Sequence, residues 1–101
     1  MTAADRLALL KSNLQMLTNS NDDLLAFLLE QGEANMNREG IVDDGSVDYE
    51  ACVIDYAAYL FRKRAASTAH NKGGMSETGM PRFLRWQMNN LLMSQKIGGS
   101  E

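Results

Sequence analysis

Residue types that mark several classes of protein are scarce in this chain of 101 residues. There is one cysteine and one histidine, which excludes an internal disulfide and leaves too few clustered ligands for a zinc site. No stretch approaches the roughly 20 apolar residues that a membrane span requires. Asp5 interrupts the region where a secretory signal would carry its apolar run. We therefore expect no membrane partner and a cytosol-like compartment.

The residues that could do chemistry are isolated from one another. Gly73-Gly74 lacks the Gly-Lys-Ser/Thr ending of a phosphate-binding loop. The run Asp43-Asp44-Gly45 resembles the start of a calcium loop, but Ile54 stands where the closing glutamate should be. Cys52 lies on the expected core side of a helix, and nothing in the sequence places His70 beside it. The sequence therefore predicts no catalytic residues, no metal site, no cofactor and no enzymatic activity.

The charges are divided unevenly between the two halves of the chain. Residues 1–50 carry ten acidic and three basic residues, a balance of −7, whereas residues 51–101 carry three acidic and seven basic residues, a balance of +4. Together these give the net charge of −3. An acidic region and a basic region favour head-to-tail contact between copies. Alternatively, the acids are solvated residues at helix starts and turns, where they are locally favourable.

The spacing of apolar residues predicts an all-α fold, in which residues 1–101 form a single domain and a small bundle of about four helices. Thr2 opens the first helix with a capping box, and we expect this helix to run to about Leu17. Turn-forming residues follow it. The second helix begins at Asn21 or Asp22, either of which is a good N-cap, and it fades near Glu39-Gly40.

The second half of the chain supplies the other two helices. Ser46 is the expected N-cap of the third, whose many small residues indicate that it is packed closely by its neighbours at the centre of the bundle. Pro81 opens the fourth, which ends at Gly98-Gly99. The predicted core comprises Leu7, Leu10, Leu14, Leu17, Leu25, Leu28, Leu29, Val53, Ala57, Leu60, Phe61, Leu84, Met88 and Leu91.

Two segments fall outside this helical pattern. Residues 67–80 contain three glycines and show no periodicity, so we expect a long, flexible, glycine-containing excursion before the last helix. A connection of this length in a small domain is more often functional than not. Residues 96–101 are expected to form a short tail.

Two groups of residues are candidates for contact with other molecules. Helical spacing turns Trp86 away from the apolar side of the last helix, which is typical of an interface anchor, although it could instead cover the edge of the core. The basic run Arg62–Arg64, with Lys72, Arg82 and Arg85, could touch nucleic acid. Adjacent helical positions point in three directions, however, and a pI of about 5.1 argues against tight DNA binding.

The second half of the chain also contains three short stretches in a distinctive order. Residues 57–66 read Ala-Ala-Tyr-Leu-Phe-Arg-Lys-Arg-Ala-Ala, residues 73–77 read Gly-Gly-Met-Ser-Glu, and Pro81 then opens a helix that contains Leu91-Leu92. This series, preceded by a leucine-rich helix and a helix opening Asp-Asp-Leu-Leu, resembles the small head–tail connector proteins of tailed bacteriophages. The likeness in layout covers nearly the whole chain, and the likeness in motif covers residues 57–92.

The resemblance implies a structural role without enzymatic activity. Such connectors form a homo-oligomeric ring beneath the portal protein, extend the channel, and dock the next head-completion or tail protein. DNA passes through the ring without specific binding. The expected location is the head–tail junction of a virion, after synthesis in the cytoplasm of the bacterial host. The alternative that the residues leave open is a small helical regulatory or nucleic-acid-binding protein.

The resemblance also assigns partner contacts to particular residues. Those in the excursion, at the helix end that leads into it, and in the tail would meet neighbouring subunits or the portal: Arg62, Lys63, Arg64, Gly73, Gly74, Met75, Ser76, Glu77 and Lys96. Trp86 joins this set as the expected interface anchor.

Overall fold

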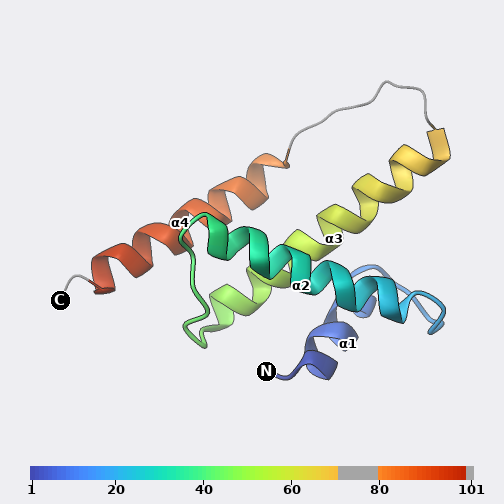
Figure 1. Ribbon diagram of the computed structural model, residues 1–101, viewed down its shortest axis with the longest axis horizontal. Coiled ribbons are helices and arrows are strands. Elements are labelled where there is room, and N and C mark those ends of the chain that lie inside the picture. Colours follow the sequence, from blue (N-terminus) through green and yellow to red (C-terminus); the bar gives the residue numbers. More distant parts are fainter. Residues whose placement is uncertain (71–79, 100–101) are drawn as a thin grey trace.

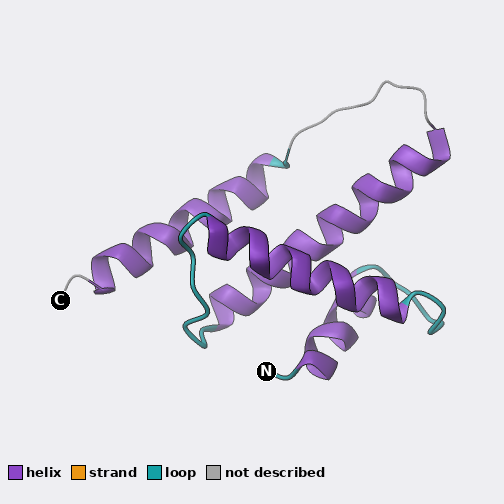
Figure 2. Cartoon of the chain, in the orientation of Figure 1, coloured by secondary structure: helices purple, strands orange, loops and turns teal. Residues whose placement is uncertain are grey.

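The computed structural model describes residues 1–70 and 80–99, and within them the side chains of residues 1–65 and 80–96. Four helices account for the secondary structure of this part: α1 (Ala3–Asn13), α2 (Asp22–Arg38), α3 (Val47–His70) and α4 (Arg82–Gly99) (Figure 1). The described residues contain no strand (Figure 2). The predicted all-α class, with four helices in a small bundle, is confirmed.

Helix α3 is the centre of the arrangement, as its small residues predict. Helices α1, α2 and α4 all pack against it, and α1 also contacts α2. Figure 1 shows α2 crossing α3, while α4 runs beside α3 along the same diagonal. The last turns of α3 and the last turns of α4 project in opposite directions, so the molecule is elongated, with principal extents of 48 × 31 × 18 Å.

The first helix begins as predicted but ends early. Thr2 and Asp5 form the capping box: the Asp5 N–H donates to Thr2 Oγ1 (3.1 Å) and the Thr2 N–H to Asp5 Oδ2 (3.2 Å). At the other end, Gln15 has a φ of +59°, and the Met16 N–H donates to the Lys11 carbonyl. This is a Schellman motif whose left-handed residue is not a glycine. The sequence therefore has no glycine at this position from which the end of the helix could be predicted.

The early end of α1 corrects one part of the predicted core. Leu17 lies beyond the helix and is 96 % exposed. The confirmed core residues, all buried, are Leu10, Leu25, Leu28, Leu29, Val53, Ala57, Leu84, Met88 and Leu91. Four others are only partly buried, packed against this core: Leu7, Leu14, Leu60 and Phe61. The last two follow Ala58, which is the last buried residue in the described part of α3.

Hydrogen bonds hold the connection between α2 and α3 at both of its ends. Gly40 has a φ of +98°, and the Ile41 N–H donates to the Met36 carbonyl, which ends α2 in a second Schellman motif. The side chains of Ile41 and Met36 are both buried, as the hydrophobic contact of that motif requires. Ser46 Oγ accepts a hydrogen bond from the Tyr49 N–H (3.1 Å), which confirms Ser46 as the N-cap of α3.

Two predicted segments have different bounds in the structure. Helix α3 continues to His70, so residues 67–70 belong to the helix and not to the excursion. No glycine or proline lies between Val47 and His70 to stop it. Helix α4 continues to Gly99, so Lys96 lies on a helix and not in a tail. Two late glycines weaken a helix by about 1 kcal/mol each without ending it.

Candidate interaction surface

Helix α4 carries apolar side chains on two opposite sides. Its buried side, formed by Leu84, Met88 and Leu91, packs into the core. The other side consists of Phe83, Trp86 and Met93, which we call the outer face of α4. Their exposed fractions are 63 %, 62 % and 57 %. A helix with a second apolar side departs from the usual surface helix, whose solvent side is polar.

The aromatic residues of the outer face lie against each other. The rings of Phe83 and Trp86 are stacked, with centroids 6.4 Å apart and an angle of 28° between the planes. Positions three apart on a helix are neighbours on its surface, so this pair follows from their spacing. Trp86 points away from the core, as its position predicts, and 62 % of its surface is exposed.

A basic edge borders this face. Arg82, Arg85 and Lys96 fall on neighbouring positions around the helix, next to the apolar row. Arg85 is engaged by Glu39, with Nη1 and Oε1 2.9 Å apart, and that hydrogen bond raises the pKa of Arg85. Arg82 and Lys96 form no ion pair with any residue that the structure describes.

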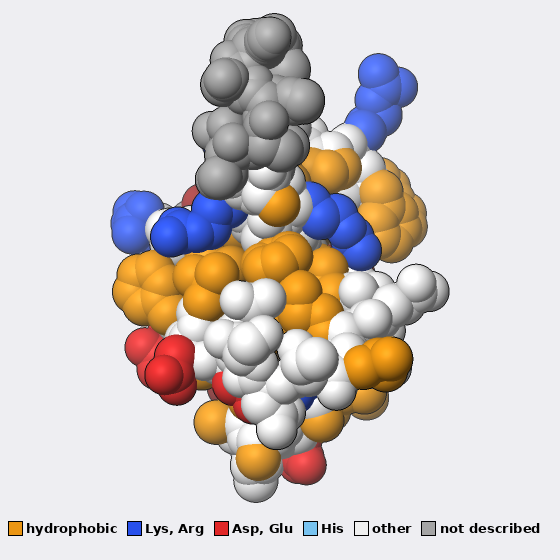
Figure 3. Space-filling view, turned by 90° about the vertical axis from the view of Figure 1, so that its right-hand side faces the viewer, with side chains coloured by type: hydrophobic (Ala, Val, Ile, Leu, Met, Phe, Trp, Pro, Cys, Tyr) orange, Lys and Arg blue, Asp and Glu red, His pale blue; other side chains and the backbone are white. Residues whose placement is uncertain are grey.

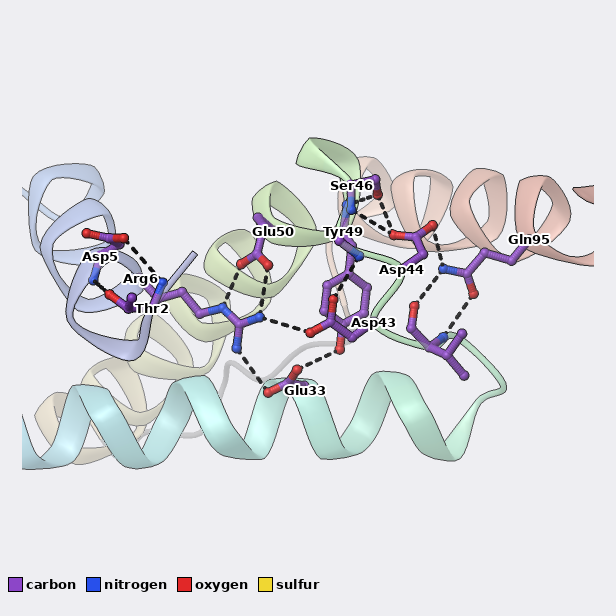
Figure 4. Close-up of polar contacts among 12 residues, drawn as sticks. Thr2, Asp5, Arg6, Glu33, Asp43, Asp44, Ser46, Tyr49, Glu50 and Gln95 are labelled. Carbon is purple, nitrogen blue, oxygen red and sulfur yellow. Dashed lines mark hydrogen bonds and ion pairs between the residues drawn. The ribbon is translucent and has the colours of Figure 1, made fainter.

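A loop contact fixes how α4 is turned about its axis. The Gln95 amide donates to the Val42 carbonyl (2.7 Å) and accepts from the Val42 N–H (2.9 Å), as Figure 4 shows. The same amide donates to Asp44 Oδ2 (3.2 Å). Hydrogen bonds from Ser46 lower the pKa of Asp44. Both the nitrogen and the oxygen of the Gln95 side-chain amide are hydrogen-bonded to the loop before α3. These bonds hold α4 in the rotation about its axis that directs its outer face away from the bundle.

The basic residues of α3 are separately engaged. Arg62 Nη2 donates to Asn13 Oδ1 (3.2 Å), and Lys63 Nζ lies 5.7 Å from the centroid of the Tyr59 ring. Arg64 is exposed on another side of the helix. Figure 3, viewed from the end where α3 projects, shows the Lys and Arg side chains spread to both sides of an apolar area. On this face, among the described residues, they form no single stripe of the kind that tracks a nucleic-acid backbone.

A charged cluster that the sequence analysis missed lies at the junction of α1, α2 and α3 (Figure 4). The Arg6 guanidinium is 2.6 Å from Glu50 Oε1, 3.1 Å from Glu33 Oε1 and 3.5 Å from Asp43 Oδ2. The Tyr49 hydroxyl donates to the second oxygen of Glu33 (3.0 Å). Hydrogen bonding to Glu50 raises the pKa of Arg6, and burial raises the pKa of Tyr49.

This cluster stabilises the fold, because each of its polar side chains is bonded to another side chain of the cluster. Arg6 and Glu50 are 44 residues apart, and neither occurs in a recognisable motif. The only sequence signal is an arginine among the leucines of the first helix, in a half of the chain that has three basic residues and ten acidic ones. Such a residue needs carboxylate partners when it is buried, but spacing alone does not say which.

The remaining reactive residues offer little chemistry. Cys52 is fully buried, as predicted, and burial raises the pKa of its thiol to about 12, so it stays protonated at neutral pH.

Among the described residues, no three His, Cys, Asp or Glu side chains are placed to hold a metal ion. No helix in the described ranges is long and apolar enough to cross a membrane. The expected contact residues Gly73, Gly74, Met75, Ser76 and Glu77 lie outside the described residues.

Comparison with known proteins identifies no relative: no family model, no curated protein and no solved structure matches this chain.

Proposed function

We propose that this chain is a head–tail connector of tailed bacteriophages. In this role it assembles with copies of itself into a ring beneath the portal protein and docks the next head-completion or tail protein. It is made in the host cytoplasm and resides at the head–tail junction of the virion. The chain acts through protein contacts and not through catalysis.

The outer face of α4 is the observation that carries this proposal. Contiguous exposed apolar side chains are a feature of contact surfaces, and tryptophan is enriched among the residues that dominate the binding energy of interfaces. The helix is already held in the bundle by Leu84, Met88 and Gln95, so the outer face is not required for folding. An adaptor needs this combination, because a stable core must present a second apolar surface to a neighbouring protein.

The arrangement of the helices also supports the proposal. Residues 57–66, which carry the first stretch of the resemblance in motif, lie on α3, and the basic residues Arg62, Lys63 and Arg64 come before the segment that joins α3 to α4. The far end of α4 carries Lys96, exposed, on the opposite side of the molecule (Figure 1). An elongated subunit with contact residues at both ends suits a protein that bridges two neighbours.

The net charge of −3 agrees with a channel through which DNA passes. Tight binding to DNA requires a protein to neutralise several phosphates with lysine or arginine. Here Arg85 is paired with Glu39, and Arg62 with Asn13. Because both of these guanidinium groups are engaged within the chain, neither is available to neutralise a phosphate.

Deletion of the gene from a phage that encodes the protein tests the proposal. The expected phenotype is DNA-filled heads that carry no tails, visible by electron microscopy, together with complete but unattached tails. Expression of the chain from a plasmid should restore infectious particles, whereas expression of Trp86→Asp should not. Normal, tailed particles from the deletion mutant would refute the connector role.

A further inference from the structure

A third exposed aromatic residue lies in the acidic half of the chain. Phe27 is 57 % exposed on α2, on the side opposite the buried Leu25, Leu28 and Leu29. Helical spacing places Asp23, Glu30 and Ala34 on the same side, and all three are exposed. We call Asp23, Phe27, Glu30 and Ala34 the outer face of α2.

The outer faces of α2 and α4 are complementary in charge and similar in their apolar centre. The first places an aromatic ring between two carboxylates, and the second places two aromatic rings beside the basic Arg82, with Met93 beside the basic Lys96. Asp23 and Glu30, like Arg82 and Lys96, form no ion pair within the described part of the chain. Opposite charges around matched apolar centres favour one docking orientation and disfavour contact between like faces.

We propose that the outer face of α4 in one copy of this chain binds the outer face of α2 in a second copy. Phe27 then packs against Phe83 and Trp86, with Asp23 and Glu30 directed at the basic edge. This inference deepens the proposed function, because it names the contact between neighbouring subunits of the ring.

The contact is head-to-tail by construction. Both helices pack against α3 and turn their outer faces away from the bundle. The two outer faces of one copy therefore cannot bind each other. When two copies bind, the outer face of α2 in one and the outer face of α4 in the other are still available to further copies. Repetition of such a contact closes into a ring when the rotation between copies is suitable.

The size of the contact determines how tightly the copies associate. An aromatic side chain buries about 150–250 Å² when fully covered, so three aromatic residues with about 60 % exposure supply roughly 270–450 Å². Stable interfaces bury at least about 1,200 Å² in total. We therefore expect association that is reversible and rises with concentration, and that a portal ring would reinforce by holding several copies side by side.

Sedimentation velocity over a wide concentration range tests the contact. The wild-type chain should show a weight-average mass that rises with concentration. Phe27→Asp and Trp86→Asp should each remain monomeric, because each places a carboxylate in one of the two apolar centres. Leu17→Asp is the matched control: it makes the same change at a residue that is 96 % exposed outside the helices, and it should associate as the wild type does. Circular dichroism establishes that all variants are folded.

A mixture of the two variants separates this contact from others. Phe27→Asp keeps an intact outer face of α4 and Trp86→Asp keeps an intact outer face of α2, so together they should form a two-copy complex and nothing larger. A wild-type chain that is monomeric throughout would overturn the proposal. So would a Phe27→Asp variant that associates normally, which would indicate contact between two α4 faces.

The association experiment and the gene deletion together distinguish failure of this contact from failure of the proposed function. If the copies do not associate by these faces but gene deletion still leaves tailless heads, the contact is wrong and the connector role stands. If the faces bind each other but the deletion mutant makes tailed particles, the contact stands and the connector role is wrong.

Discussion

Replacement of Arg6 tests the account of how the fold is held together. Arg6→Met keeps most of the aliphatic stem and removes the guanidinium. Glu50, whose side chain is 12 % exposed, then becomes a buried carboxylate without its partner. Removal of one partner of a buried pair costs about 3–5 kcal/mol, whereas exposed pairs contribute about 1 kcal/mol or less. Asp43 is 47 % exposed and Glu33 26 %, so Glu50 dominates the loss.

We expect Arg6→Met to lower the free energy of unfolding by about 3 kcal/mol, which is a large part of the about 5–15 kcal/mol available to a domain. Urea unfolding followed by circular dichroism measures this change. Arg38→Met is the control, because Arg38 is exposed and bonds only to Asn35, so its loss should stay within about 0.5 kcal/mol.

A double variant completes the test. Arg6→Met with Glu50→Leu removes the carboxylate that the single change orphans, so it should recover a large part of the lost stability. The reasoning fails if Arg6→Met is no more destabilising than Arg38→Met, or if the two changes at Arg6 and Glu50 are simply additive.

Two further predictions concern the core. Burial raises the pKa of Cys52 from 9.0 to about 12, so the stability that the neutral thiol contributes is complete below about pH 9 and is lost as the pH rises toward 12. Cys52→Ala should therefore lose less stability than the wild type between neutral pH and about pH 10.5 in urea titrations; equal losses would contradict this. At Gly32, a Cβ would lie 3.5 Å from Tyr56 Cβ, which is ordinary contact. Gly32→Ala should stabilise by up to about 1 kcal/mol and Gly32→Leu should destabilise by about 1–3 kcal/mol in thermal melts; a destabilised alanine variant would refute this.

Local signals predicted the parts of the fold that depend on neighbouring residues. The caps at Thr2 and Ser46 are present because their hydroxyls need only residues three positions away. The buried sides of α2 and α4 follow the helical repeat, and the same repeat placed Trp86 on the solvent side.

The errors arose where the decisive contacts lie elsewhere. The end of α1 depends on Gln15 in a left-handed conformation, for which the sequence offers no glycine. Helix α3 continues to His70 because nothing breaks it before the first glycine of the excursion. The Arg6 cluster joins residues from three helices and a loop, which no local pattern connects. Phe27 is a different case, because helical spacing already places it beside Asp23 and Glu30, and only its exposed fraction of 57 % shows that no other helix covers this side.

The most direct test of the proposed role is the mass of the complex with the portal protein. Purified chain is mixed with portal rings from the same phage and examined by size exclusion with light scattering. The account predicts one species whose mass exceeds that of the portal ring by several copies of the chain, and loss of that species with Trp86→Asp. Elution of the portal ring and the free chain as two separate species at every concentration would contradict it.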